Sequence, residues 1–557
     1  MSQNPVQLIQ KRKIGYILGI IALLIVLAFL GTPGVIGESA SGEGGFRGGK
    51  LARLRYESGL SEGQLGKIDP ASQTMRLATF GMRGVAAAIL WEKANEFKMK
   101  KDWTNFSTTL EQIARLEPHF PKVWQFQGWN TAYNVSAEFD DFRERYHWVI
   151  KGVEYLKNGI SFNENIPKLY VEVGRTISQK IGRADESRQF RRLFREDDLY
   201  HGSRPVVERD NWLCGREWYL QGERTYEEGN SIDNLAESML YVSAPMCLVD
   251  YADNLEKDGI FGEKAAKAYQ DALNDWVNNY GQREFRVVTW DELTRKVPES
   301  ERGKLRIRLG DLESLQKRQA EFSAQIDQLA PGIREGLYQE KLSQLSEEER
   351  QALEMKLEEM RLPRERILHD MAVKQLQIPD RHVTDRMKVT DSLKGKPLEQ
   401  ALDLVRESEA LDPMVRQIQT DRGTINYNYW KLHSRVEQHP AALEAQERIW
   451  EARRAAKQSD VAASDLFLQG FAAWRKVFDD PDPEMVAVRT DDQYFSDWYE
   501  DIEAYQKFLA SMDMDDEFPA DFPLAEVLEW SADQERIRAA AMEAERQRTQ
   551  QDPNRPI

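Results

Sequence analysis

The sequence of 557 residues predicts an all-α protein, a solenoid of helix hairpins with a long charged helical insertion and one transmembrane helix near the N-terminus. Three observations predict this fold. Apolar residues recur at spacings of three and four along most of the chain, which is the periodicity of amphipathic helices. Alternating runs of Val, Ile and Thr, the pattern of strands, are nearly absent. One uncharged apolar segment lies close to the start of the chain.

Residues 14–36 are the predicted transmembrane helix, and residues 1–13 the cytoplasmic N-terminus before it. Ile14–Leu30 carries no charge, and at about 1.5 Å per residue its helix would be roughly 26 Å long, close to the ~30 Å of a hydrocarbon layer. A cleaved signal peptide and a buried core helix are the alternatives, but the long run and the lack of a clean cleavage site favour an uncleaved single-pass anchor. Because Lys11–Lys13 is basic, the positive-inside rule favours a periplasmic body on the outer side of the cytoplasmic (inner) membrane.

Residues 37–67 are predicted to form a flexible tether, because Gly and Ser dominate its first part. Gly44–Lys50 has the glycine and lysine spacing of a phosphate-binding loop. However, Leu51 stands where Ser or Thr would hold magnesium, and no predicted strand precedes the loop. We therefore interpret this segment as tether and predict no cofactor.

Two helical repeat regions are predicted, over residues 68–290 and residues 427–530. Residues 184–211, which are polar and rich in Arg and Asp, are expected to form a long loop between helices. Residues 531–557 are expected to form a polar helix that frays into a disordered tail.

Between the two regions, residues 291–426 are predicted to form a charged, aromatic-poor helical arm. Phe322 and Tyr338 are its only aromatic residues. Leucines seven residues before and after Phe322 extend a narrow apolar seam, which suits a helical hairpin or a short coiled coil. Further along the arm, the sequence Ser346–Glu349 predicts a capping box that starts another helix. A partner-binding role is the alternative interpretation of the arm.

Within the repeat regions, large and small residues alternate in a way that lets the two helices of a hairpin interlock. The residues that follow this pattern are Leu90, Ala94, Phe97, Phe106, Leu110, Ile113, Trp124, Gly128, Gly152, Leu156, Gly159, Tyr170, Val173, Gly174, Ile177, Leu248, Tyr251, Ala252, Leu255, Ala265, Tyr269, Ala272, Tyr429, Leu432, Val436, Ala445, Ile449 and Ala452. The pattern resembles the tetratricopeptide repeat family. It departs from that family at Lys93 and Gln127, where an apolar residue is usual, and at Phe106 and His433, where a small one is usual.

The resemblance implies a curved stack of helix hairpins that presents a concave groove to a peptide or a partner protein. Generic helix packing, which also favours small residues at crossings, is the alternative explanation of the pattern. Trp91, Trp124, Trp129 and Tyr170 are the aromatic residues expected either to line such a groove or to pack between helices.

The sequence contains none of the common hydrolase, dinucleotide or metalloprotease motifs, and its seven histidines show no ligand spacing. We therefore predict no enzymatic activity, no catalytic residue and no metal site. A net charge of −17, from 76 Lys and Arg against 93 Asp and Glu, argues against nucleic-acid binding. Cys214 and Cys247 could form a disulfide in an oxidising compartment, or remain two separate buried thiols.

These observations predict a membrane-anchored scaffold that binds protein partners on the extracytoplasmic side. One alternative is an envelope spacer that forms homo-oligomers through the central arm. Another is an enzyme of a helical class whose site the sequence does not reveal.

Overall fold

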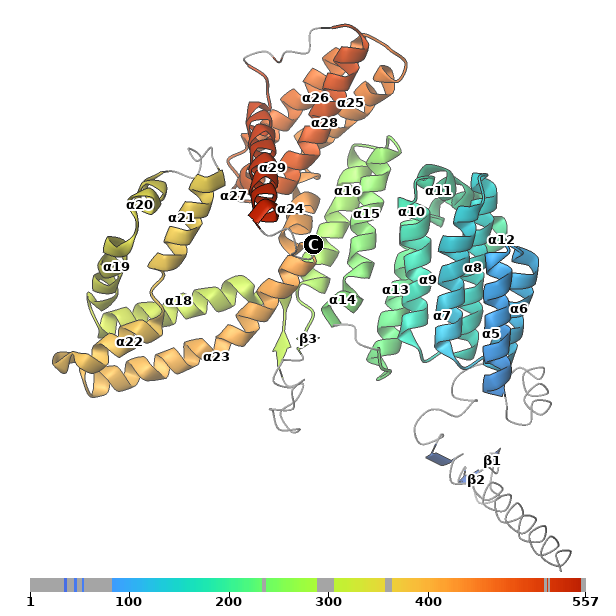
Figure 1. Ribbon diagram of the computed structural model, residues 1–557, viewed down its shortest axis with the longest axis horizontal. Helices are drawn as coiled ribbons and strands as arrows, with labels where there is room; N and C mark the ends of the chain where they lie inside the picture. Colours follow the sequence, from blue (N-terminus) through green and yellow to red (C-terminus); the bar gives the residue numbers. More distant parts are fainter. Residues whose placement is uncertain are drawn as a thin grey trace, which may run out of the picture. The chain divides into compact units, whose positions relative to one another are not determined.

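The computed structural model describes residues 35–37, 45–47, 53–54, 83–232, 237–287, 305–355, 363–514, 518 and 521–551. Most of these residues lie in helices, which confirms the all-α prediction (Figure 1). The chain divides into two compact units, unit 1 over Met1–Asn234 and unit 2 over Leu235–Ile557.

Two short strands precede the helices of unit 1. Strand β1 (Val35–Gly37) pairs antiparallel with β2 (Gly45–Arg47), with Val35 opposite Arg47. These strands fall at the end of the predicted membrane segment and inside the predicted tether; the rest of residues 14–36 lies outside the described part of the chain. Among the described residues, no helix combines the length and the apolar character that crossing a membrane requires.

Unit 1 is a stack of helices that pack against one another in sequence order. Helix α5 packs on α6, α7 on α8, α8 on α9 and α9 on α13, so each hairpin lies beside the next (Figure 1). Its helices are α5 (Arg83–Met99), α6 (Trp103–Leu116), α7 (Pro121–Trp129), α8 (Phe142–Phe162), α9 (Pro167–Arg175), α10 (Ile181–Arg183), α11 (Ser187–Glu196), α12 (Asp198–His201) and α13 (Asn211–Glu227). The π-helical segments Asn130–Val135 and Thr176–Lys180 continue α7 and α9.

Glycines set the close approach of α7 and α8, at the positions where the sequence pattern requires small residues. A Cβ on Gly128 would lie 2.4 Å from Cγ of Leu156, and one on Gly159 would lie 2.6 Å from Cγ of Trp124. A Cβ on Gly152 would meet backbone, since it would lie 2.7 Å from the carbonyl oxygen of Gly128. The small and large residues of these two helices therefore interlock as the pattern predicts.

The expectation of a long loop over residues 184–211 is wrong. Helices α11 and α12 occupy much of it, and Phe190 and Phe194 are 1% and 0% exposed. The two rings lie one helical turn apart and bury against the core of unit 1. The many arginines of α11 hid this spacing, because the overall composition of the segment is that of a solvated loop.

Unit 2 contains two groups of helices that are separated by the arm. The first group is α14 (Glu237–Tyr241), α15 (Ser243–Lys257) and α16 (Glu263–Asn274), which a π-helical segment extends over Asp275–Tyr280. The second group is α24 (Tyr427–Val436), α25 (Pro440–Ala456), α26 (Ala462–Phe478), α27 (Pro483–Val486), α28 (Asp492–Ser511) and α29 (Ala525–Gln551). The indole Nε1 of Trp276 donates a hydrogen bond to the carbonyl oxygen of Tyr427 over 3.1 Å. Since α16 and α24 are neighbours, the arm is an insertion between two adjoining helices of one array.

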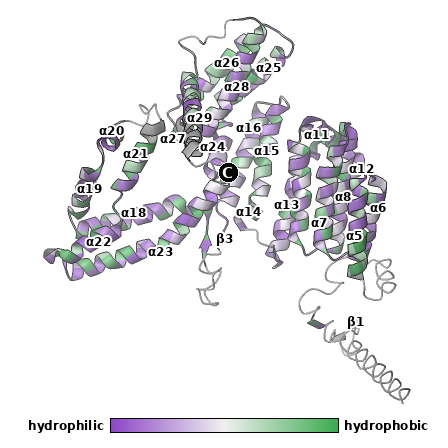
Figure 2. Cartoon of the chain, viewed as in Figure 1, coloured by the Kyte–Doolittle hydropathy of each residue, from purple (hydrophilic) through white to green (hydrophobic). Residues whose placement is uncertain are grey.

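The described part of the arm contains two long α-helices and four shorter ones. Its elements are β3 (Phe285–Arg286) paired with β4 (Arg306–Ile307), then α18 (Leu312–Leu329), α19 (Ile333–Gln344), α20 (Glu347–Glu354), α21 (Pro363–Leu376), α22 (Asp380–Val389) and α23 (Lys396–Thr424). Helix α18 packs on α23, and apolar and polar residues alternate along both (Figure 2). Phe322 and Ile326 of the predicted seam are 8% and 0% exposed, so α18 buries its seam within this chain. Ser346 and Glu349 form the predicted capping box at the start of α20.

Candidate binding surface

A stripe of partly exposed aromatic residues runs along the first helices of unit 1. Phe126, Trp129 and Tyr133 lie on one face of α7 and its π-helical extension, because their spacings of three and four bring them to the same side. Phe126 and Trp129 are each 43% exposed. Trp91 on α5 continues the stripe, with its ring centroid 5.1 Å from that of Phe126. We call these four residues the aromatic stripe.

Basic and amide groups border the stripe. The Lys180 ammonium lies 5.2 Å from the centre of the Tyr133 ring, close enough for a cation–π interaction. Burial lowers the pKa of Lys180, although Glu186 acts in the opposite direction. On the other side, Lys98 Nζ donates to Oδ1 of Asn130 over 2.9 Å. Acidic residues lie near the same border, since Glu186 acts on Lys180 and Glu172 on Tyr133, so Lys98 and Lys180 are cations within a mixed-charge border.

Two buried amides beneath the stripe have unused hydrogen-bonding capacity within the chain. Asn130 is 0% exposed, and its Oδ1 accepts from Lys98 and from Asn134 Nδ2, whereas its own Nδ2 has no partner. Gln127 is 2% exposed, and its Oε1 has no partner. Buried polar groups are nearly always hydrogen-bonded, so two such atoms in one turn are unusual for a purely structural helix.

Two π-helical segments determine the positions of Tyr133 and Lys180. The segments Asn130–Val135 and Thr176–Lys180 lie on neighbouring helices and contact each other. A π-helical turn holds an extra residue and rotates the side chains that follow it, and such turns are frequent at functional sites. Here they place Tyr133 and Lys180 against each other. Neither segment is predicted from the sequence.

The four aromatic residues predicted from the sequence to line a groove or pack between helices occupy different environments in the structure. Trp124 is core, since it is 4% exposed and its Nε1 donates to the carbonyl oxygen of Pro118 over 2.8 Å. Tyr170 is partly buried, and its hydroxyl donates to the carbonyl oxygen of Glu164 over 3.0 Å. Trp91 and Trp129 belong to the aromatic stripe. Phe126 and Tyr133, which complete the stripe, were missed, although their spacing from Trp129 was a readable signal.

Cys214 and Cys247 are buried as thiols, and no disulfide joins them. Cys214 lies on α13 in unit 1, whereas Cys247 lies on α15 in unit 2. Each residue is 2% exposed within its own unit. Burial raises the pKa of Cys214 to about 12, even though Arg204 Nη1 lies 2.7 Å from its sulfur.

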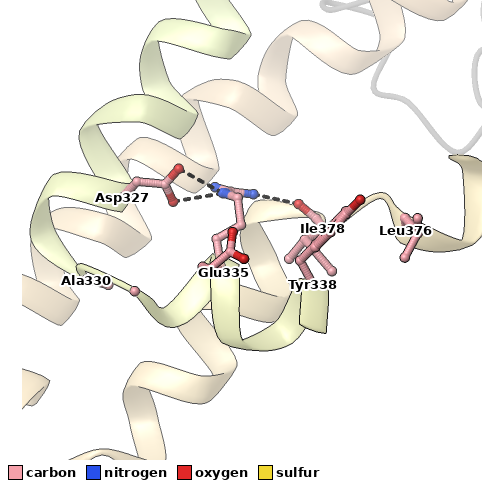
Figure 3. A pocket seen from close by; sticks show the side chains of 8 residues that line it. Asp327, Ala330, Glu335, Tyr338, Leu376 and Ile378 are labelled. Atoms are coloured by element: carbon pink, nitrogen blue, oxygen red, sulfur yellow. Dashed lines mark hydrogen bonds and ion pairs between the residues drawn. The ribbon is translucent and has the colours of Figure 1, made fainter. Parts of the chain in front are cut away.

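One pocket of about 330 Å³ lies in the arm, between α18, α19 and the end of α21 (Figure 3). The Arg334 guanidinium is its central polar group. It donates to both oxygens of Asp327, to the carbonyl oxygen of Ile378 and to Asp380 Oδ1. These bonds tie three segments of the arm together, so the polar wall of this pocket is chiefly structural.

The described residues bring one group of acid and base side chains together in unit 2, around His433 on α24. Asp253 on α15, Tyr269 on α16 and Glu437 after α24 lie around its imidazole, and Glu256 on α15 is joined to them through the Tyr269 hydroxyl. Sequence reasoning missed this group because 180 residues separate Asp253 from His433. The one available signal was that a histidine occupies a position where the repeat pattern has a small residue.

The chain matches no protein-family description, no curated protein and no solved structure in comparisons with known proteins. Its function is therefore inferred from its own geometry.

Proposed function

We propose that this protein is a membrane-anchored scaffold whose unit 1 binds a segment of a partner protein along the aromatic stripe, on the extracytoplasmic side. The observation that carries the proposal is the exposure of Phe126 and Trp129 on one helix face. Exposed aromatic residues that stand on rigid helices resemble the anchors that dominate protein–protein interfaces.

The surroundings of the stripe favour an extended segment with apolar and acidic residues. Apolar side chains of such a segment would cover Trp91, Phe126 and Trp129, and an acidic group would be attracted to Lys98 and Lys180. An extended segment presents its side chains at regular intervals, so it suits a row of exposed rings with a cation at either end.

Site-specific photo-cross-linking tests the proposal in the full-length protein in its native membrane. A photoreactive residue replaces Trp129, and the cross-linked peptide of the partner is identified by mass spectrometry. Position 199 provides the matched control, since Leu199 is 99% exposed in the same unit but lies on α12. We expect the probe at position 129 to cross-link to one defined segment of the partner. The probe at position 199 should give no cross-link to that segment.

A second substitution checks that the stripe acts as one surface. Phe126→Ala should reduce cross-linking from position 129 by about tenfold, the effect expected when an interface anchor is removed. Cross-links that are the same from positions 129 and 199, or that persist in Phe126→Ala, would contradict binding at the stripe.

The alternative of an envelope spacer that forms oligomers through the arm stays a prediction. Because the arm buries Phe322 and Ile326 within the chain, oligomers would have to use another of its faces. Ile367 and Met371, one helical turn apart on α21, are exposed apolar side chains of the arm that such a contact could use.

A further inference from the structure

The acid and base groups around His433 form a compact, buried set that the proposed function does not use. His433 Nε2 lies 2.9 Å from Asp253 Oδ1, and His433 Nδ1 lies 3.9 Å from Glu437 Oε1. The Tyr269 hydroxyl lies 3.0 Å from Asp253 Oδ1 and 2.9 Å from Glu256 Oε2. We call these five residues the His433 cluster. They come from helices on both sides of the arm in the sequence.

A second layer of polar residues surrounds the cluster. The Tyr494 hydroxyl lies 3.4 Å from His433 Nδ1, and the Tyr429 hydroxyl donates to Asp497 Oδ2 over 2.9 Å. Gln446 Nε2 donates to Glu437 Oε2 over 3.4 Å. The titratable or charged groups that act on the cluster are Asp253, Glu256 and Lys257 from α15, Tyr269 from α16, Tyr429, His433 and Glu437 from α24 and its end, and Tyr494 and Asp497 from α28.

The cluster holds more acidic groups than basic ones. It has three carboxyl groups and a single imidazole, and Glu256 and Glu437 are almost completely buried, with 7% and 1% of each residue exposed. Glu256 Oε1 has no hydrogen-bond partner. An unpaired buried charge is very costly, so the surplus carboxylates must be neutralised. Protons bound by the carboxyl groups would neutralise them, in addition to the nearby Lys257.

The electrostatics of the cluster support this reasoning. Burial raises the pKa of Glu437 to about 7, with Asp253 adding to the shift and His433 opposing it. Burial and the neighbouring Glu437 also raise the pKa of Glu256 well above its ordinary value. Burial acts to lower the pKa of His433, but Asp253 and Glu437 outweigh it and raise that pKa to about 9.

We propose that the His433 cluster is a proton-controlled clasp, which holds the helices before the arm to the helices after it while protonated and loosens them when the pH rises. Helices α16 and α24 carry the cluster residues Tyr269 and His433, and the contact between Trp276 and Tyr427 at the root of the arm joins α24 to the π-helical extension of α16. Loosening the clasp therefore releases the attachment of the arm. This inference does not depend on the aromatic stripe.

The direction of the pH effect follows from which state binds protons more tightly. The folded-state pKa of Glu437 lies above the ordinary 4.5, so its contribution to stability is complete below pH 4.5 and is lost as the pH rises towards 7. The folded-state pKa of His433 lies above 6.5, so its contribution is lost as the pH rises from 6.5 towards 9. Both groups thus weaken unit 2 as the pH rises, by about 100-fold in the folding equilibrium for Glu437 alone.

Hydrogen exchange of the full-length protein tests the proposal at pH 5, 7 and 9, with each rate corrected for intrinsic exchange at that pH. Protection of α16 and α24 should fall about 100-fold between pH 5 and pH 7 and fall further by pH 9. Glu437→Gln keeps the shape of the side chain but carries no charge, so it should remove most of the fall between pH 5 and pH 7. Glu447→Gln, at an exposed position on α25, is the matched control and should follow the wild type.

Two results would overturn the proposal. One is protection of α16 and α24 that stays level or rises from pH 5 to pH 9 in the wild type, a measurement that needs no variant. The other is a Glu437→Gln profile that parallels the wild type. If Glu437→Gln does not fold, the wild-type profile alone decides, with the helices of unit 1 as the internal reference.

Discussion

Gly152→Ala tests the helix contact on which the stack of unit 1 depends. An alanine inside a helix is ordinarily more stabilising than a glycine, by about 1 kcal/mol. At position 152, however, the added Cβ would lie 2.7 Å from the carbonyl oxygen of Gly128, and 2.8 and 2.9 Å from Cβ and N of Ala132. Ordinary contact begins at 3.4 Å, and two of these atoms are backbone, so α7 and α8 must move apart. Overpacking costs about 1–3 kcal/mol, and because backbone atoms cannot move aside we expect the upper part of this range, about 2–3 kcal/mol, which leaves a net loss of about 1–2 kcal/mol.

Hydrogen exchange of α7 and α8 in the full-length protein measures this loss directly, because it reports on unit 1 without assuming that both units unfold together. Gly84→Ala is the matched control in the same unit: nothing lies within 4 Å of its added Cβ, so the variant should be neutral or slightly more stable. A Gly152→Ala protein that is as stable as the wild type would refute the close approach of the two helices.

Three further predictions follow from particular contacts. Arg422→Ala should lower the free energy of unfolding by about 2 kcal/mol, because it removes a 7% exposed guanidinium that donates to several acceptors at the root of the arm. The control is Arg406→Ala on the same helix, which removes a 75% exposed side chain and should cost at most about 0.5 kcal/mol. Urea unfolding of the two variants measures both effects. Ser346→Ala should reduce protection at the start of α20 by about 1 kcal/mol in hydrogen exchange, since it removes the capping box. Cys214 and Cys247 should react slowly with iodoacetamide at pH 8 in the native protein, because both are buried. In denaturant without a reductant both should react rapidly, and intact mass should show two labels. A protein that takes up two labels only after reduction would contradict the presence of two free thiols.

The sequence predicted those parts of the fold that depend on local spacing. Gly128, Gly152 and Gly159 were expected at helix contacts and occur there, because a small residue at a fixed spacing has few other uses in a helix. The capping box was predicted from a local spacing as well, because Ser346 and Glu349 stand three residues apart in the sequence. What the sequence could not predict was the pairing of α16 with α24, since the arm separates Trp276 from Tyr427 by 151 residues and the contact has no local signature.

The positions that broke the repeat pattern turn out to mark two of the polar sites of the molecule. Gln127 stands where an apolar residue is usual, and its buried side chain lies under the aromatic stripe with an unpaired oxygen. His433 stands where a small residue is usual, and it is the centre of the buried cluster. Folding alone would favour an apolar residue at the first position and a small one at the second, since a buried polar group adds a desolvation cost. Phe106 shows the opposite case, because it also departs from the pattern but simply fills the core at 3% exposure. A departure from the repeat pattern therefore indicates a site only when the unexpected residue is both polar and buried. Gln127 and His433 meet this condition, whereas Lys93 is exposed and does not.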